Sequence, residues 1–336
     1  MRPAPPPEPT SSAGADRAAA VNPVHRPSDR VRWHVHGLNN DTIFGLTCWG
    51  VTHFPRWLSG AIGHAGTWLA FQGMKEATSA LIGNLRVALP ALGDRELRAL
   101  ALRTYRSYAS ETIDFIRSLS ADPRSLVAML SPVSRFDPVR GDGRGLVLVT
   151  GHVGNIELGA VILRVVYGLR LAAVVLPEPD PLVNERRRQM RASLGIESIE
   201  VRQGTDTALR IRRVLSEDGV VALICDRPLG RDRVDVEFFG RRTAFLRTPA
   251  LIGYLTGAPL VPSFILRQPD GRYTGVTLDP IRVSRTGDRD ANVAADMQTF
   301  ASALETIVRQ YPHLWYHFYP YWGDDAGGRP GRSRVD

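Results

Sequence analysis

The chain has 336 residues, 43% of them hydrophobic, which is enough to bury a large core in one sizeable domain or two small ones. Its formal net charge is +8, and because Lys75 is the only lysine, the positive charge is almost entirely arginine. Two cysteines without a Cys-x-x-Cys motif argue against a disulfide scaffold and a structural zinc site. The N-terminus lacks the apolar core of a signal peptide, and no run of about 18 apolar residues predicts a transmembrane helix.

The arginine surplus suits planar, bidentate recognition of phosphate and carboxylate groups. A basic surface can serve nucleic acid, an anionic membrane or an acidic carrier protein, and arginine-rich composition can also reflect the genome alone. The net charge alone does not distinguish these possible partners.

Four segments are predicted along the chain. Residues 1–30 are rich in proline, alanine, serine and arginine and are predicted to form a disordered tail. Residues 326–336 are predicted to form a flexible tail. Residues 31–120 are predicted to be a helical region that docks at a membrane interface, and 121–325 an α/β core that forms one globular unit with it.

The basis for the docking prediction is the aromatic content of 41–71. This stretch is moderately apolar, is broken by Pro55 and several glycines, and carries three tryptophans, Trp49, Trp57 and Trp68. Tryptophan-rich amphipathic segments suit the membrane–water interface. A buried helix pair in an ordinary core is the alternative.

From Lys75 to Leu119 the pattern is helical, with an interruption at 90–93. Asp94 is predicted to cap a helix over about 95–118, and 120–142 is predicted to be irregular or to contain short helices. Strands and helices then alternate. Strands are predicted at 146–150, 171–176, within 195–201, 220–224, 234–239 (as an edge strand), 260–266 and 273–278. Helices are predicted at 156–167, 184–193, 205–217, 249–256 and 293–310. This alternation predicts an α/β fold with a mixed, largely parallel sheet flanked by helices.

The first candidate site follows the strand at 146–150. His152 lies in a turn directly after that strand, Asn155 is a good N-cap for the next helix, and Glu157 is one turn into it. In open α/β sheets, ligands bind at this edge. We therefore predict a dyad in which the carboxylate of Glu157 folds back to the imidazole of His152, although a structural histidine fits the pattern alone equally well.

The turn itself is a second reason to expect a ligand. Gly151 and Gly154 allow the backbone to approach a substrate closely, and the helix N-terminus favours negative charge. Gly154 and Asn155 are therefore predicted to contact substrate, and the amides after Gly154 are candidate oxyanion donors.

Another polar pair, Asp226 and Arg227, follows the strand at 220–224. Because the carboxyl ends of parallel strands share one edge, Asp226 is predicted to assist His152 and Arg227 to bind an anionic group. A surface Asp–Arg turn is the alternative. In the arginine-rich helix, Arg188 and Arg191 are candidate phosphate or carboxylate ligands, against the default of a solvated charged face. No serine nucleophile elbow, zinc-protease motif, phosphate-binding loop or dinucleotide fingerprint occurs.

Taken in order, five stretches resemble the bacterial lipid A late acyltransferases and the related phosphatidylinositol mannoside acyltransferases. They are GHVGNIE, the series Asn184…Arg191…Gly195, CDRP, VEFFGRR with TPALIGYLTGAPLVPSFILR, and the ending LWYHFYPYW. The likeness covers roughly 40–322, including Asn84, Pro90 and Glu111 in the helical lead-in.

What the resemblance implies is an acyltransferase at the cytoplasmic face of the inner membrane. It would move a fatty acyl group from acyl-CoA or acyl carrier protein to a hydroxyl of a membrane lipid, without a metal, a further cofactor or a nucleic-acid partner. The family's H-x4-D/E motif falls on His152 and Glu157, its downstream acidic residue on Asp226, and its substrate-binding asparagine and arginine on Asn184 and Arg191. The missing N-terminal membrane-spanning helix and the aromatic ending are departures from the best-known members. A glycosyltransferase using a nucleotide sugar, and a non-catalytic lipid- or nucleic-acid-binding protein, are the competing hypotheses.

Overall fold

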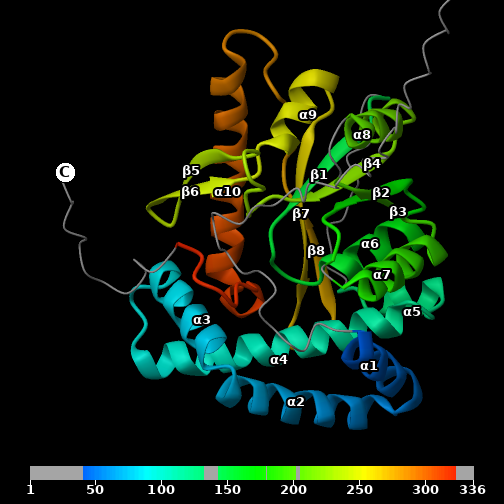
Figure 1. Cartoon of the computed structure of the whole chain (residues 1–336), viewed down its shortest axis with the longest axis vertical. Coiled ribbons are helices and arrows are strands. Elements are labelled where there is room, and N and C mark those ends of the chain that lie inside the picture. Colours follow the sequence, from blue (N-terminus) through cyan, green and yellow to red (C-terminus); the bar gives the residue numbers. More distant parts are fainter. Residues whose placement is uncertain (1–40, 132–142, 179, 202–204, 323–336) are drawn as a thin grey trace, which may run out of the picture. The chain divides into compact units, whose positions relative to one another are not determined.

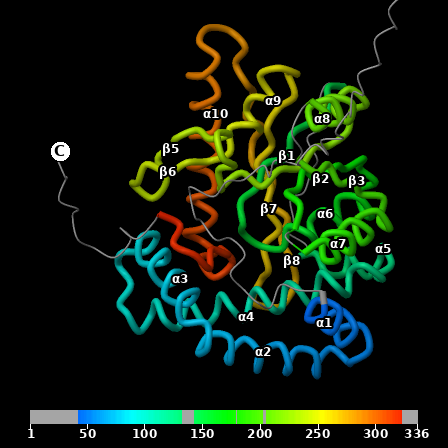
Figure 2. The backbone as a smooth tube through the Cα atoms, viewed as in Figure 1, coloured from blue at the N-terminus to red at the C-terminus, as the bar shows by residue number. Residues whose placement is uncertain are grey.

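The computed structural model describes residues 41–131, 143–178, 180–201 and 205–322 (Figures 1 and 2). The tails predicted for 1–30 and 326–336 lie outside them. So does the part of the predicted irregular stretch between 132 and 142.

The main sheet has six strands in the order β3-β2-β4-β1-β7-β8. β1, β2, β3, β4 and β7 run parallel, and β8 pairs antiparallel with β7 at one edge. This confirms the predicted mixed, largely parallel sheet. The strands of the sheet are β1 (Leu146–Thr150), β2 (Leu171–Val175), β3 (Glu197–Glu200), β4 (Val220–Ile224), β7 (Leu260–Arg267) and β8 (Tyr273–Thr277).

Helices cover both faces because alternate residues of the central strand point to opposite sides. Val147 and Val149 belong to the large core beneath α8, α9 and α10, whereas Leu146 and Leu148 pack with residues of α6. Figure 1 shows α10 and α6 on opposite sides of the sheet. The helices of this region are α5 (Pro123–Ala128), α6 (Ile156–Val165), α7 (Pro181–Ser193), α8 (Asp206–Ser216), α9 (Thr248–Thr256) and α10 (Arg289–Gln310).

The strand predicted at 234–239 is present as β5 (Val234–Phe238). Among the described residues it pairs with β6 (Arg241–Phe245), which was not predicted, in a separate two-stranded sheet and not in the main sheet. The two residues that join them, Phe239 and Gly240, both have positive φ, as the two-residue hairpin turn requires. Phenylalanine rarely adopts this conformation, so little in the residue pattern indicates a turn here.

Four helices precede the sheet: α1 (Asp41–His53), α2 (Arg56–Gly73), α3 (Lys75–Ala88) and α4 (Asp94–Ser118). α2 lies alongside α4, and buried side chains of α2, α3 and α4 share a small apolar core (Figure 2). The N-cap of α4 is Gly93, not the predicted Asp94, and the Gly93 amide donates to Oε2 of Glu96 at 2.9 Å.

The three tryptophans of α1 and α2 and several of their aliphatic side chains are exposed. Trp57 is 73% exposed, and Trp49, Trp68, Leu46, Ile62 and Leu69 are also exposed. Within the described part of the chain, no helix has both the length and the apolar content needed to cross a bilayer.

Candidate active site

His152 lies in the turn between β1 and α6, as predicted from the strand and cap signals. β1 is buried along its whole length, and Asn155 caps α6 by accepting a hydrogen bond from the Leu158 amide. Gly154 has a φ of +68°, and a Cβ there would collide with the Ile265 carbonyl. The turn is therefore pressed onto β7 and can be made only with glycine at this position.

Asp226 is the carboxylate that holds the imidazole. Nδ1 of His152 lies 2.6 Å from Oδ1 of Asp226, and the His152 backbone amide donates to Oδ2 at 2.9 Å. Asp226 is fully buried, whereas the His152 side chain is 25% exposed. The predicted convergence of the two strand ends, β1 and β4, thus brings these two residues into direct contact.

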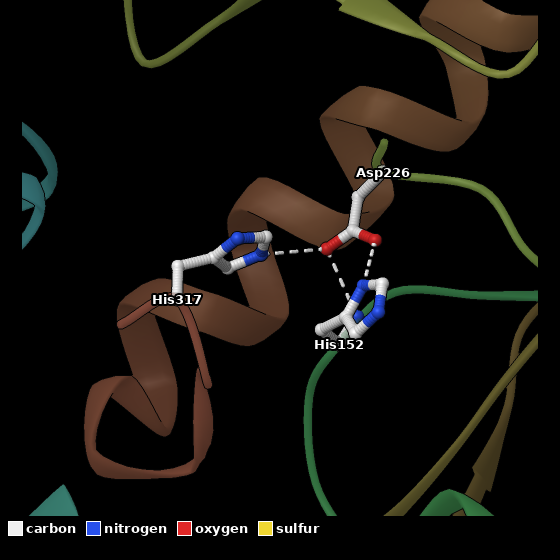
Figure 3. A group of neighbouring side chains, drawn as sticks. All are labelled: His152, Asp226 and His317. Atoms are coloured by element: carbon white, nitrogen blue, oxygen red, sulfur yellow. Dashed lines mark hydrogen bonds and ion pairs between the residues drawn. The ribbon is translucent and has the colours of Figure 1, made fainter. Parts of the chain in front are cut away.

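A second histidine binds the same carboxylate from the opposite side (Figure 3). Nε2 of His317 lies 2.9 Å from Oδ2 of Asp226, and Nδ1 of His317 lies 2.8 Å from the hydroxyl of Tyr319. His317 is fully buried. The ring centroids of the two histidines are 5.5 Å apart in an edge-on contact, and both rings bond to the same carboxylate.

The C-terminal segment 314–322 is fastened to both the site and the N-terminal helices. The Tyr316 amide donates to the His152 carbonyl at 2.8 Å, and Tyr321 donates its hydroxyl hydrogen to the Asp226 carbonyl at 2.6 Å. Asn84 of α3 donates to the carbonyls of His317 and Tyr319 and accepts from the Tyr321 amide. The segment therefore cannot move without disturbing Asp226.

These contacts set the protonation states. Burial alone would raise the pKa of Asp226, but the charge of His152 and hydrogen bonds from both histidines hold it well below its usual range. Burial, aided by the nearby charge of Arg227, lowers the pKa of His152, with Asp226 acting in the opposite direction. Burial also lowers the pKa of His317, to about 3. At neutral pH the carboxylate is charged and both imidazoles are neutral.

This arrangement defines a base. A carboxylate only accepts hydrogen bonds, so the hydrogen of His152 lies on Nδ1 and the lone pair on Nε2. In the histidine–carboxylate pairs of hydrolases the same tautomer lets Nε2 take a proton from a hydroxyl. Among the described residues, His152, Asp226 and His317 are the group whose donor atoms are close enough for a metal, but these atoms are hydrogen-bonded to one another.

A second buried network lies behind the turn. Glu111 of α4 accepts a hydrogen bond from the Tyr316 hydroxyl at 2.8 Å, and Asn155 donates to the Glu111 carbonyl at 2.9 Å. Burial raises the pKa of Glu111 to about 8 despite the hydrogen bond from Tyr316. Nearby, Asp114 accepts from Tyr273 and Arg267.

The matching family model is that of bacterial lipid A biosynthesis acyltransferases, and it covers residues 39–323. The chain belongs to this family. It is 30% identical to the phosphatidylinositol mannoside acyltransferase of Mycolicibacterium smegmatis over 54% of this chain and 57% of that protein. It is 28% identical to the protein of the same name from Mycobacterium tuberculosis, over 69% of this chain and 72% of that one.

The solved structures include one that resembles this acyltransferase at low similarity. It is the 1-acyl-sn-glycerophosphate acyltransferase PlsC of Thermotoga maritima, with 15% identity, a TM-score of 0.37, and coverage of 75% of this chain and 98% of that one. Family membership confirms the resemblance seen in the sequence and favours an acyltransferase over a glycosyltransferase or a non-catalytic binding protein.

The structure corrects the predicted dyad of this acyltransferase. Glu157 forms an ion pair with Arg191 of α7, and its bonds in the structure go to that guanidinium and not to His152. The reason is geometric: Glu157 lies past the N-cap of α6, where its side chain meets α7, whereas Asp226 comes directly off the neighbouring strand end. Glu157 and Arg191 therefore contact each other, and neither is bonded to His152.

The remaining predicted substrate ligands fall into two groups. Arg227 lies at the site, where it donates to the Tyr316 carbonyl at 3.1 Å and its guanidinium stacks 4.8 Å from the Tyr319 ring centroid. Asn184 of α7 instead joins the Glu178 amide to the Glu200 carboxylate, and Arg188 pairs with Glu185 on the exposed face of α7. The structure does not bring these two to His152 through any bond.

The candidate oxyanion donors after Gly154 are also engaged. The amides of Gly154, Asn155 and Ile156 donate to the carbonyls of Leu314, Ile265 and Gly154 respectively. Both side-chain ends of Asn155 are bonded as well. These hydrogen bonds occupy the three amides, and Gly154 and Asn155 shape the turn; contact of the turn with substrate or an oxyanion stays a prediction.

Sequence reasoning did not identify His317, Tyr319 or Tyr321 as site residues. Their signal was a histidine inside the aromatic ending LWYHFYPYW, which suggested the family but no role. Nothing in residue spacing indicates that this ending crosses back to the end of β4.

Proposed function

We propose that this protein is a membrane-associated O-acyltransferase. It moves a fatty acyl group from acyl-CoA or acyl carrier protein to a hydroxyl of a membrane glycolipid. The observation that carries the proposal is the 2.6 Å contact between His152 and Asp226 in a member of the acyltransferase family, because it leaves Nε2 of a partly exposed imidazole as the base.

The transfer is direct. Nε2 of His152 takes the proton of the acceptor hydroxyl, and the oxygen attacks the thioester carbonyl. A C–O bond forms, the C–S bond breaks, and the thiolate leaves with the proton from the imidazolium. Asp226 stabilises the imidazolium while it is charged. Arg227 is the proposed donor to the oxyanion, because it lies at the site and a guanidinium offers five N–H groups.

A lipid surface is the proposed site of action. Between Thr42 and Gly73 the chain has one Arg, Lys, Asp or Glu, which is Arg56, and this residue bonds to Asp114. The exposed tryptophans of α1 and α2 therefore lie on helices that are almost without charge, which suits the headgroup–acyl boundary. The net charge of +8 favours an anionic bilayer, which we take to be the cytoplasmic face of the inner membrane.

The relatives' printed name supplies the proposed acceptor, a phosphatidylinositol mannoside or a glycolipid like it. The test incubates the purified protein with such a glycolipid and with labelled acyl-CoA, labelled acyl carrier protein or a labelled nucleotide sugar. An acylated glycolipid is expected with an acyl donor, and none from the nucleotide sugar. His152→Ala should abolish transfer without unfolding the protein, whereas His64→Ala, at an exposed position of α2, should retain it. Full activity in His152→Ala would refute the proposed base.

A further inference from the structure

We propose that His317 is a positioning residue for the acyl transfer: it neutralises one oxygen of Asp226 by a hydrogen bond, so that the other is kept for the imidazole of His152. This inference rests on the proposed function. It assigns a role to a residue whose hydrogen bond goes to Asp226 and whose ring lies edge-on to the imidazole of His152.

The direction of each hydrogen bond follows from chemistry. An ionised carboxylate only accepts, so Nε2 of His317 must donate to Oδ2 of Asp226 across 2.9 Å. Because burial keeps His317 neutral, its Nδ1 has no hydrogen and must accept one from the Tyr319 hydroxyl at 2.8 Å. The Tyr319 hydroxyl thus fixes the tautomer of His317 in which Nε2 is the donor.

The two carboxylate oxygens are consequently unequal. Oδ2 accepts from His317 and from the His152 amide, each at 2.9 Å, whereas Oδ1 lies 2.6 Å from Nδ1 of His152. The backbone of Asp226 is held at its carbonyl by the Tyr321 hydroxyl. A carboxylate bound at three points cannot rotate, so Oδ1 stays in line with the imidazole.

The pKa of His152 depends on the negative charge of Asp226 that faces its imidazole. The charged and titratable groups facing His152 are Asp226 and Arg227 after β4 and His317 in the C-terminal segment. A donor on Oδ2 draws negative charge away from Oδ1. Without that donor, more negative charge faces His152, and its protonated form is favoured. The imidazole would then be blocked as a base up to a higher pH.

The test measures kcat and KM against pH with acyl-CoA for two variants. His317→Leu removes the donor, whereas His317→Gln can place an amide N–H near the position of Nε2. We expect kcat of His317→Leu to fall on the order of 10- to 100-fold, as for loss of a hydrogen bond to a charged group, with KM little changed. The acid limb of kcat should move to higher pH, and His317→Gln should recover most of both.

A merely structural role predicts a different result. If both variants lose activity equally, or if His317→Leu keeps the wild-type kcat and pH profile, the inference is overturned. If His317→Leu does not fold, Tyr319→Phe takes its place; the lost hydroxyl fixes the tautomer of His317 but also bonds Arg227, so the position of the acid limb decides the test. A smaller loss of kcat with the same upward shift is then expected, and a wild-type profile would contradict the inference.

These measurements also distinguish the positioning role of His317 from the proposed acyltransferase function on which it rests. Failure of the wild-type protein to transfer acyl groups from either donor would refute the proposed function. Wild-type transfer with unaffected His317→Leu and Tyr319→Phe variants would refute the positioning role alone.

Discussion

Glu157 and Arg191 form an ion pair between α6 and α7, and the imidazole five residues before Glu157 is held by Asp226 instead. The Arg191 side chain is only 13% exposed. The Glu157 side chain is 30% exposed, so the pair is partly buried; it links two helices, and loss of one member leaves the other charge without this partner.

Removing either member should therefore lower transfer, but less than His152→Ala does. We expect Glu157→Gln and Arg191→Met each to reduce kcat/KM, and the double variant to fall little further, with a coupling energy of about 0.5–3 kcal/mol. The matched control is Glu185→Gln with Arg188→Met, an exposed pair on α7, for which coupling should stay below about 0.5 kcal/mol. Fully additive effects at Glu157 and Arg191 would contradict the prediction.

Asp226→Asn tests the tautomer of His152. An amide nitrogen next to Nδ1 donates where a carboxylate accepts, and thus favours the hydrogen on Nε2. We expect kcat to fall by roughly 10²- to 10⁴-fold, by analogy with hydrolase triads, while circular dichroism stays native. Retention of activity within a few-fold of wild type would show that Asp226 does not orient the base.

Glu111 should make the protein less stable as the pH rises. Its pKa is raised to about 8 by burial, so the folded state keeps a proton that the unfolded state loses near its ordinary pKa of 4.5. The stabilisation is complete below about pH 4.5 and declines up to about pH 8, a change of roughly 3–5 kcal/mol for this group.

Glu111→Gln mimics the protonated form and should remove that decline. Urea unfolding at pH 5 and pH 8 should show a smaller difference for the variant than for the wild type. Glu185→Gln, on an exposed face, serves as the control. Equal pH dependence in wild type and Glu111→Gln would mean that Glu111 is ionised in the folded protein.

His317 should make the protein less stable as the pH falls. Its folded pKa of about 3 lies below the ordinary value of 6.5, so the unfolded state gains a proton that the folded state refuses. Its stabilisation is complete above about pH 6.5 and is lost progressively towards pH 3. The melting temperature of His317→Gln should therefore fall less between pH 7.5 and 5 than that of the wild type. The exposed His64→Gln should follow the wild type, and a His317→Gln curve parallel to the wild type would argue against a neutral buried His317.

The face of α1 and α2 should bind anionic vesicles. Trp57→Glu with Trp68→Glu places two charges on that face and should reduce flotation with phosphatidylglycerol vesicles at least several-fold. Leu209→Glu with Leu255→Glu makes the same charge change at exposed apolar positions of α8 and α9, and should bind almost normally. Equal loss in both double variants would point to net charge rather than to this face.

Local signals in the sequence predicted much of the fold. The apolar run at 146–150 and the N-cap at Asn155 correctly located β1 and α6, because both are decided by neighbouring residues. The meeting of His152 and Asp226 followed from parallel strand topology alone. The β5–β6 hairpin was missed because its turn uses Phe239 at positive φ.

The partners of the base were harder to predict. Glu157 had the better sequence position, but which carboxylate reaches an imidazole depends on side-chain direction, and α7 supplied a competing guanidinium. His317 lies 91 residues from Asp226 in the chain, and its contact depends on how the aromatic ending folds back over α3 and α4. No periodicity in the sequence predicts that the C-terminal segment folds back in this way.

The fastening of 314–322 to Asn84 also bears on when the protein becomes active during its synthesis. Asn84 bonds to Tyr319 across 235 residues, so this contact can form only after Tyr319 has left the ribosome. A nascent chain that ends before His317 already contains His152 and Asp226, but it lacks the hydrogen bonds from His317 and Tyr321 that hold Asp226 in place. Acyl transfer by a nascent chain should therefore remain weak until the residues up to Tyr321 have been synthesised and have folded onto Asp226.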